Sequence, residues 1–280
     1  MTDELDWLRF SAGGVEGALR VARGGTEGRV LFLPAMGVSA TYYDPFLLAL
    51  AAENIDAAVL ELRGQGESPV RPKRGTDFGY LEILREDVPA ALEAFDGPPP
   101  VLVGHSLGGH LTMMFAAERP DALAAIALIA CGTAWPGGYG RRGWARVYFG
   151  TRAMRAVSSV LGWYPGHKLG FGGKQPKQLI HDWAGMARGN RYGARGSSLD
   201  YEAALGELPL EALGISIEGD HNAPTAAMNA VLDKLPAERL TRRHMTASDL
   251  PERSLDHQRW AREPGAIATE LAAFVRAQSR

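Results

Sequence analysis

The residues with the clearest chemical potential lie in the hexapeptide Gly-His-Ser-Leu-Gly-Gly, residues 104–109. An apolar run at residues 101–104 predicts a strand before it, and residues 107–118 predict a helix after it. A serine at so tight a strand-to-helix turn projects its hydroxyl above the sheet, and glycines two residues away on either side remove Cβ atoms that would clash there. We therefore expect Ser106 to be a nucleophile. The alternative is a glycine-rich turn in which Ser106 only caps the helix.

A nucleophilic serine requires a base, and the base requires an orienting acid; in this architecture they follow in the order Ser, Asp, His. Asp220 stands just after a strand predicted over residues 213–218, at the strand end where such sheets carry functional groups. His257 follows 37 residues later, beyond the last predicted strand and before the closing helix. We expect Asp220 and His257 to complete the site. Glu218 is the alternative acid and His244 the alternative base.

The oxyanion that forms during acyl transfer requires backbone N–H donors, one from the residue after the nucleophile and one from the loop after an early strand. Leu107 is the residue after the nucleophile. The loop at residues 34–38 follows the strand predicted over residues 30–33. We expect Val38 to supply the second donor, with Met36 as the alternative.

Apolar segments alternate with amphipathic segments along the chain, and this alternation predicts a mainly parallel sheet with helices on both faces. The fold class is therefore α/β. The predicted strands are residues 30–33, 57–62, 101–104, 124–130, 213–218 and 239–244. The predicted helices are residues 41–53, 77–95, 107–118, 223–234 and 264–277.

The composition changes between residues 132 and 200, which hold 15 of the 34 glycines and four of the six tryptophans. We interpret this segment as an insertion between sheet units. It carries eleven Lys or Arg and two Asp, a charge of +9, so the rest of the chain carries -11 of the total of -2. The excess positive charge either receives an anionic substrate, such as a thioester on a phosphorylated carrier, or forms a basic face. Such a face is solvated or meets the acidic rest of the chain by charge complementarity. Arg141 and Arg142 are the test positions.

Overall composition excludes several classes of function. The 280 residues carry 30 Lys or Arg and 32 Asp or Glu, so the basic excess that binds nucleic-acid backbones is missing. The longest apolar run, residues 122–131, is too short to span a membrane. Cys131 is the single cysteine, and residues 1–6 are acidic, unlike a secretory signal, so we expect a cytoplasmic protein. The histidine spacing indicates no metal site, and no glycine loop has a phosphate-binding pattern, so we expect no cofactor.

Several of these motifs together resemble the α/β-hydrolase superfamily, and within it a group of predicted serine hydrolases. The matching pieces are Leu-Pro-Ala-Met-Gly-Val at residues 33–38, Tyr-Tyr at 42–43, Glu-Leu-Arg-Gly-Gln-Gly-Glu-Ser at 61–68, the serine hexapeptide, and residues 164–172. The resemblance implies an eight-stranded, mostly parallel sheet and a helical cap between the sixth and seventh strands. The implied core is residues 1–131 and 201–280, and the implied cap is residues 132–200. The resemblance also implies a triad of Ser106, Asp220 and His257.

The chemistry that follows is hydrolysis of a small-molecule carboxylic ester or thioester through an acyl-enzyme. The same three side chains would serve an acyltransferase, in which an alcohol, amine or thiol takes the place of water. A third possibility is a binding protein that keeps the pocket for a small apolar ligand without catalysis. A serine-directed reagent separates this last possibility from the other two.

Overall fold

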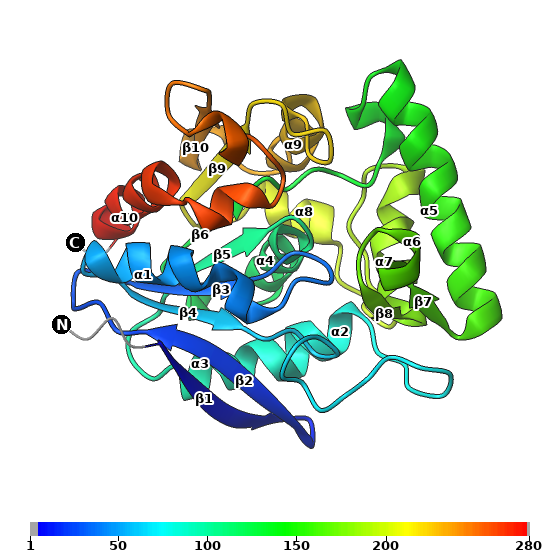
Figure 1. Ribbon diagram of the computed structural model, residues 1–280, viewed down its shortest axis with the longest axis horizontal. Helices are drawn as coiled ribbons and strands as arrows, with labels where there is room; N and C mark the ends of the chain where they lie inside the picture. The colour runs from blue at the N-terminus through cyan, green and yellow to red at the C-terminus, as the bar shows by residue number, and fades with distance from the viewer. Residues whose placement is uncertain (1–4, 279–280) are drawn as a thin grey trace.

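An eight-stranded sheet runs through the computed structural model, which describes residues 5–278 (Figure 1). Strand β2 is antiparallel to both of its neighbours, and all other neighbouring strands are parallel. The strand order is β1 (Leu5–Ala12), β2 (Val15–Ala22), β4 (Asp56–Leu60), β3 (Arg29–Leu33), β5 (Val101–His105), β6 (Ala125–Ile129), β9 (Ala212–Ile217) and β10 (Leu240–Met245). The predicted α/β class and the mostly parallel eight-stranded sheet are confirmed.

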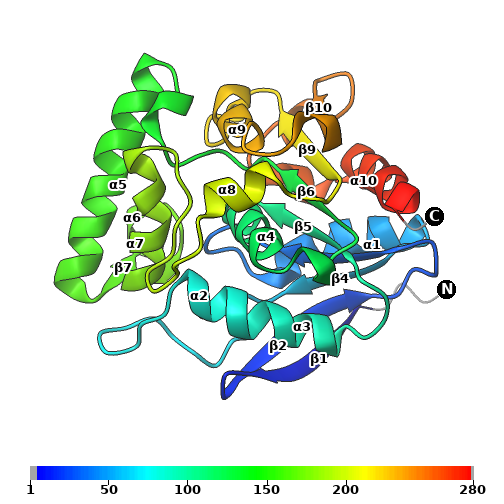
Figure 2. The ribbon, with the colours of Figure 1, turned by 180° about the vertical axis from the view of Figure 1, so that it is seen from behind.

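Alternation along the strands divides the core between the two faces of the sheet. In β3, Val30 and Phe32 join the core under α1 (Asp44–Ala52) and α10 (Gly265–Gln278). Leu31 and Leu33 join the core on the opposite face, with the side chains of α3 (Val88–Ala94) and α4 (Leu107–Glu118). Helices α8 (Tyr201–Gly206) and α9 (Thr225–Leu232) also contribute to this second core (Figure 2). Because both faces are covered, the central strands are mostly apolar.

Observed element boundaries lie within a few residues of the predicted ones. The helix predicted over residues 107–118 is α4. The helix predicted over residues 77–95 starts at α2 (Tyr80–Glu82), passes through a π-helical turn at Ile83–Asp87 and continues as α3. Strands β1 and β2 were not predicted from the residue pattern, because neither has the continuous apolar run of the central strands. The family resemblance implied eight strands without placing these two.

Residues 132–200 form a separate group of elements between β6 and β9 (Figure 1). The longest is α5 (Arg141–Leu161), which packs against α7 (Lys177–Gly185). Between them, α6 (Gly166–Leu169) connects two short antiparallel strands, β7 (Trp163–Pro165) and β8 (Lys174–Pro176). This insertion touches the loop after β3, where a Cβ on Gly37 would lie 2.6 Å from the backbone of Gly172.

Close approach of α4 to the sheet depends on glycine. A Cβ on Gly108 would lie 1.9 Å from the carbonyl oxygen of Leu33, and one on Gly104 would lie 2.3 Å from the backbone of Gly108. Backbone atoms cannot move away from such a contact without separating the helix from β3 and β5. The two glycines therefore fix the height of the first turn of α4 above the strand ends.

We expect Gly108→Ala to lower the free energy of unfolding by about 3 kcal/mol or more, because the new methyl group overlaps a backbone carbonyl. Urea unfolding followed by circular dichroism measures the change. The matched control is Gly185→Ala, at a helical position where an added Cβ meets nothing within 4 Å. The control should change stability by no more than about 1 kcal/mol. An unfolding midpoint of Gly108→Ala equal to that of the unchanged protein would contradict this account.

Candidate active site

Ser106 occupies the sharp turn between β5 and α4. Its backbone angles, φ 53° and ψ -113°, lie where residues with a Cβ are strained. The turn is held by hydrogen bonds from the Ser106 N–H to the Ile129 carbonyl (3.2 Å) and from the Gly109 N–H to the Ser106 carbonyl (3.0 Å). The strained backbone thus presents the hydroxyl of Ser106 at the carboxyl end of the central strand.

The three residues expected to form the site lie in one chain of hydrogen bonds. The Oγ of Ser106 lies 3.0 Å from Nε2 of His257, and Nδ1 of the same ring lies 2.8 Å from Oδ2 of Asp220. The other carboxylate oxygen of Asp220 accepts backbone hydrogen bonds from Asn222 (2.8 Å) and Ala223 (2.9 Å). The carboxylate is fully buried, so these donors and the imidazole compensate for its lost hydration. The arrangement permits proton transfer from Ser106 to His257 while Asp220 orients the ring.

Both alternative residues have other partners. His244 lies in β10 and pairs through Nδ1 with the hydroxyl of Ser216 at 2.9 Å. The carboxylate of Glu218 accepts the backbone N–H of Ala247 at 3.0 Å. His244 and Glu218 thus form hydrogen bonds beside the edge strand β10. The histidine that contacts Ser106 is His257.

The loop that carries His257 is anchored by its neighbours in sequence. The carboxylate of Asp256 accepts the backbone N–H groups of Gln258 (3.0 Å) and Arg259 (3.1 Å), which closes a turn beside the histidine. Trp260 is fully buried, with ring centroids 5.3 Å from those of Phe46 and His105. A tryptophan inserted into the core therefore fixes the position of an otherwise irregular segment.

The N–H of Val38, the expected second oxyanion donor, forms a different hydrogen bond in this structure. It donates to the carbonyl of Ala35 (3.1 Å), closing a turn in which Gly37 has φ 79°, and the side chain of Val38 belongs to the core under α1. The alternative, Met36, lies at the tip of this turn and lines the same cavity as Ser106 and Leu107. Within residues 5–278, no protein acceptor pairs with the N–H of Met36 or of Leu107. These two groups are the available donors beside Ser106.

A buried phenol connects this loop to the residue before the nucleophile. The hydroxyl of Tyr43 accepts the N–H of Ala35 (3.0 Å) and shares a hydrogen bond with Nδ1 of His105 (2.8 Å). Burial raises the pKa of the Tyr43 phenol and lowers the pKa of His105 well below its usual value, so the phenol keeps its proton and the imidazole stays neutral. Tyr43 therefore joins the turn that presents Met36 to the turn that presents Ser106. Sequence reasoning did not identify this role, although both tyrosines at 42–43 belong to the family resemblance.

Glu61 holds the far end of the same loop. Its buried carboxylate accepts the N–H groups of Ala40 (3.3 Å) and Glu67 (3.2 Å). Burial raises the pKa of Glu61 from 4.5 to about 7, because two backbone donors only partly replace the lost water.

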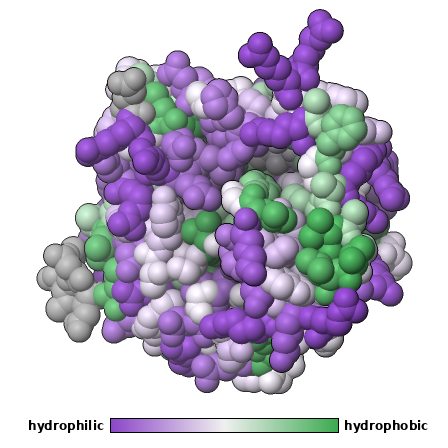
Figure 3. Space-filling view, turned by 45° about the vertical axis from the view of Figure 1, so that its right-hand side comes forward, coloured by the Kyte–Doolittle hydropathy of each residue, from purple (hydrophilic) through white to green (hydrophobic). Residues whose placement is uncertain are grey.

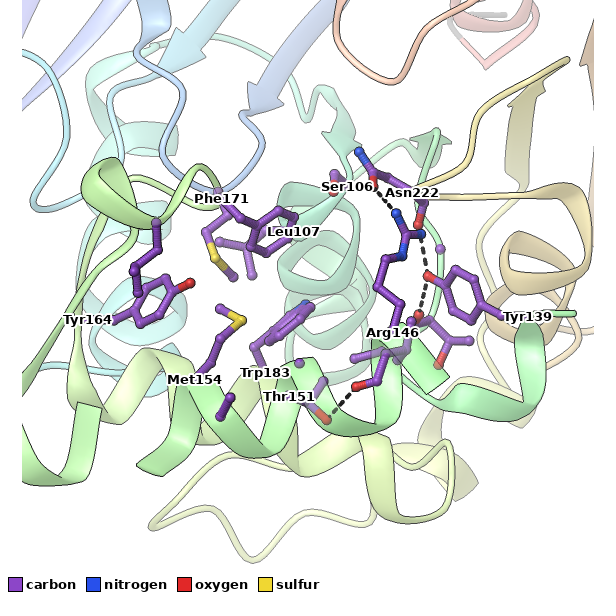
Figure 4. Close-up of a pocket in the computed structure, with 18 of the residues that line it drawn as sticks. Ser106, Leu107, Tyr139, Arg146, Thr151, Met154, Tyr164, Phe171, Trp183 and Asn222 are labelled. Carbon is purple, nitrogen blue, oxygen red and sulfur yellow. Dashed lines mark hydrogen bonds between the residues drawn. The ribbon is translucent and has the colours of Figure 1, made fainter. Parts of the chain in front are cut away.

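A cavity of about 360 Å³ opens next to Ser106 and His257 (Figure 4). Its walls are mainly apolar and come largely from the insertion. The apolar lining includes Leu107, Met154, Val157, Tyr164, Phe171 and Trp183. The polar lining includes Thr133, Tyr139, Arg146, Thr151 and Asn222. A ligand with an extended apolar part fits such walls, and polar groups at one end can orient it.

The outer face of the insertion also carries apolar side chains, seen as the hydrophobic group in Figure 3. The exposed large apolar side chains of residues 132–200 are Trp135, Trp144, Phe149, Val160, Leu161, Leu169, Phe171 and Leu199. Of these, Leu169 and Phe171 also line the cavity beside Ser106. No helix within the described part of the chain has the length and apolar character needed to cross a membrane. Among the same residues, no group of three or more His, Cys, Asp or Glu side chains is placed to hold a metal ion.

Comparison with known proteins identifies relatives. Residues 30–270 match the model of the family described as Alpha/beta hydrolase family. The putative carbamate hydrolase RutD of Variovorax paradoxus is 33% identical over 101 residues, 36% of either chain. Protein phosphatase methylesterase 1 of Mus musculus is 39% identical over 105 residues, 36% of this chain and 26% of that one. The chain thus spans about a third or less of the length of these curated relatives.

Solved structures agree on the fold. A thermophilic esterase from Thermogutta terrifontis superposes with a TM-score of 0.67 at 18% identity, over 98% of this chain and 99% of that chain. At this level of identity the likeness concerns the fold alone.

The raised pKa of Glu61 predicts a pH dependence of stability. The Glu61 carboxyl keeps its proton up to about pH 7 in the folded protein, whereas it releases the proton near pH 4.5 in the unfolded chain. The resulting contribution to the free energy of unfolding is complete at low pH and is lost as the pH rises through 7. Between pH 5 and pH 8 we expect the free energy of unfolding of the unchanged protein to fall by about 2–3 kcal/mol relative to that of Glu61→Gln. Urea unfolding at both pH values measures the change. Glu16→Gln, which alters an exposed carboxylate that does not act on the pKa of Glu61, is the control. Parallel stability curves for the unchanged protein and Glu61→Gln would contradict the prediction.

Proposed function

The chain belongs to the alpha/beta hydrolase family, and from this premise we propose that it is a serine hydrolase that cleaves a carboxylic ester or thioester through an acyl-enzyme. The observation that carries the proposal is the chain of hydrogen bonds from Ser106 through His257 to Asp220 beside an apolar cavity. The hydrolase relatives support the general class of reaction. The type of nucleophile and the bond that is cleaved are inferred from the residues.

In the first half of the reaction, Oγ of Ser106 attacks the carbonyl carbon of the substrate. His257 takes the hydroxyl proton through Nε2 as the new C–O bond forms. When the tetrahedral intermediate collapses, the bond from carbon to the leaving oxygen or sulfur breaks, and His257 returns the proton to that atom. The products of this half are an acyl ester on Ser106 and a free alcohol or thiol.

In the second half, water replaces the departed group. His257 removes a proton from the water as its oxygen attacks the acyl carbon, and it then protonates Oγ of Ser106 as the free acid leaves. Asp220 holds the imidazole in the tautomer that has a free Nε2 and stabilises the ring when it is charged. The two half-reactions balance without a redox partner or a cofactor.

In this proposal, the N–H groups of Leu107 and Met36 stabilise the negative charge that develops on the substrate oxygen. Both residues line the cavity beside Ser106, and one such donor is worth ~10²-fold to 10³-fold in turnover. Tyr43 acts on this step as a positioning residue, because its hydroxyl fixes the turn that carries Met36.

The cavity supports an apolar acyl group as the part of the substrate that is retained on Ser106. Its walls of Met154, Tyr164 and Phe171 come from residues 132–200, which we assign as a cap over a core of residues 1–131 and 201–280. Burying each methylene of the acyl chain contributes about 0.8 kcal/mol, so specificity should rise with chain length until the cavity is full.

We expect Ser106→Ala to lower kcat by ~10⁴-fold or more on 4-nitrophenyl esters and acyl thioesters of increasing chain length. The matched control is Ser159→Ala, because Ser159 also pairs with a histidine, His181 at 3.0 Å, on the exposed side of the insertion. The control should retain normal turnover. Product analysis with an added thiol separates free acid from a transferred acyl group.

Near-normal turnover by Ser106→Ala would contradict the proposed mechanism. Transfer of the acyl group to the thiol in preference to water would replace hydrolysis by acyl transfer on the same three residues. Binding of acyl compounds without turnover by the unchanged protein would leave only a binding function.

A further inference from the structure

A second cavity adjoins the one that contains Ser106. It measures about 410 Å³, is more open to solvent than the first cavity, and lies between the first turns of α5 and the loop that follows Asp220. Tyr139 and Arg146 line both cavities, so the two spaces share a wall and meet at these side chains. The proposed acyl site is therefore adjacent to a separate space on the outer side of Arg146.

This second cavity is positively charged. Arg142, Arg146 and His221 line it, and no Asp or Glu lines either cavity. Within residues 5–278, Arg142 forms neither a hydrogen bond nor a salt bridge through its side chain. Arg146 donates only to neutral acceptors, the carbonyl of His221 and Oδ1 of Asn222 (3.3 Å). Two guanidinium charges thus remain without an anionic partner.

The nearby carboxylate of Asp220 does not neutralise these cations. It points inward, where it accepts hydrogen bonds from His257 and from the backbone of Asn222 and Ala223. Loop residues 221 and 222 instead present a carbonyl and an amide oxygen to Arg146. The positive charge therefore remains available to a ligand.

The orientation of the Arg146 side chain shows where this positive charge lies relative to the expected reaction centre. Arg146 extends from α5 toward the end of the first cavity where Ser106 and Asn222 lie, whereas Tyr164 and Met154 lie at the other end (Figure 4). An acyl chain among the apolar side chains would place the carbonyl carbon at Ser106 and the leaving group on the side of Arg146. The second cavity then lies in the path of the leaving group.

We propose that the cavity lined by Arg142, Arg146 and His221 binds a phosphate group on the alcohol or thiol part of the substrate. This proposal rests on the proposed function and adds the chemical class of the leaving group. A phosphate dianion matches two guanidinium groups, each of which can donate two parallel hydrogen bonds to its oxygens. The phosphate is bound and released unchanged, so the bonds that form and break are those of the acyl transfer alone.

Binding to the inactive Ser106→Ala protein tests the proposal without dependence on turnover. S-hexanoyl-4′-phosphopantetheine and S-hexanoylpantetheine are the probes, because they differ only in the phosphate. Calorimetry should give a Kd about tenfold lower for the phosphorylated probe at low ionic strength, with a smaller preference at high salt.

Removing either cation should reduce that preference. In the Ser106→Ala background, Arg142→Gln and Arg146→Gln should each lower the affinity ratio of the two probes by about threefold to tenfold. Arg152→Gln is the matched control, because Arg152 is on the same helix, donates to the carbonyl of Tyr148 and lines neither cavity. The control should keep the preference of its parent.

Equal affinity for both probes, or a preference that survives Arg142→Gln and Arg146→Gln, would overturn the phosphate site. An equal loss for both probes in Arg146→Gln, with no effect of Arg142→Gln, would also overturn it and leave Arg146 as a structural connection to the Asp220 loop. Ser106-dependent turnover of both probes at equal rates would reject the phosphate site while supporting the proposed function. A phosphate preference in binding without any turnover by the unchanged protein would retain the site and reject the proposed function.

Discussion

The hydrogen bond between Nε2 of His257 and Oγ of Ser106 joins residues that are 151 positions apart, and the rest of the site depends on it. Each partner is fixed by a different part of the fold. Ser106 is held by the strained turn between β5 and α4, whose closeness to β3 requires Gly104 and Gly108. His257 is held by a turn at Asp256 and by the burial of Trp260 against aromatic residues of the core. The hydroxyl of Ser106 is activated as a nucleophile only if Ser106 and His257 are both held in these positions.

The loop after β3 adds a second constraint on the same centre. Tyr43 and Glu61 bind this loop from opposite ends through backbone N–H groups, so the turn that contains Met36 is rigid before any ligand arrives. Electrostatic stabilisation of an oxyanion depends on such preorganisation, because donors that must first reorient contribute less. The insertion completes the cavity by placing apolar side chains at one end and Arg146 at the other, which gives an unsymmetrical ester one preferred orientation.

Local patterns in the sequence predicted the central strands, α4 and the position of Ser106, because a continuous apolar run followed by a glycine-flanked serine has few other interpretations. The N–H of Val38 closes the turn at Gly37, and the pattern of residue types does not reveal this local hydrogen bond. Tyr43 and Arg146 were not identified as site residues since their roles depend on contacts between distant segments. The basic character of the insertion was visible in the sequence, but only the fold shows that Arg142 and Arg146, and not Arg141, line the second cavity.

Reaction with a fluorophosphonate, followed by peptide mass spectrometry, tests the central claim most directly, because this reagent reports the activated serine itself and requires no knowledge of the substrate. The account predicts one covalent adduct, located on Ser106, that forms far more slowly in His257→Ala and is absent in Ser106→Ala. An adduct on another residue, or no adduct in the unchanged protein under conditions that label a known serine hydrolase, would contradict it.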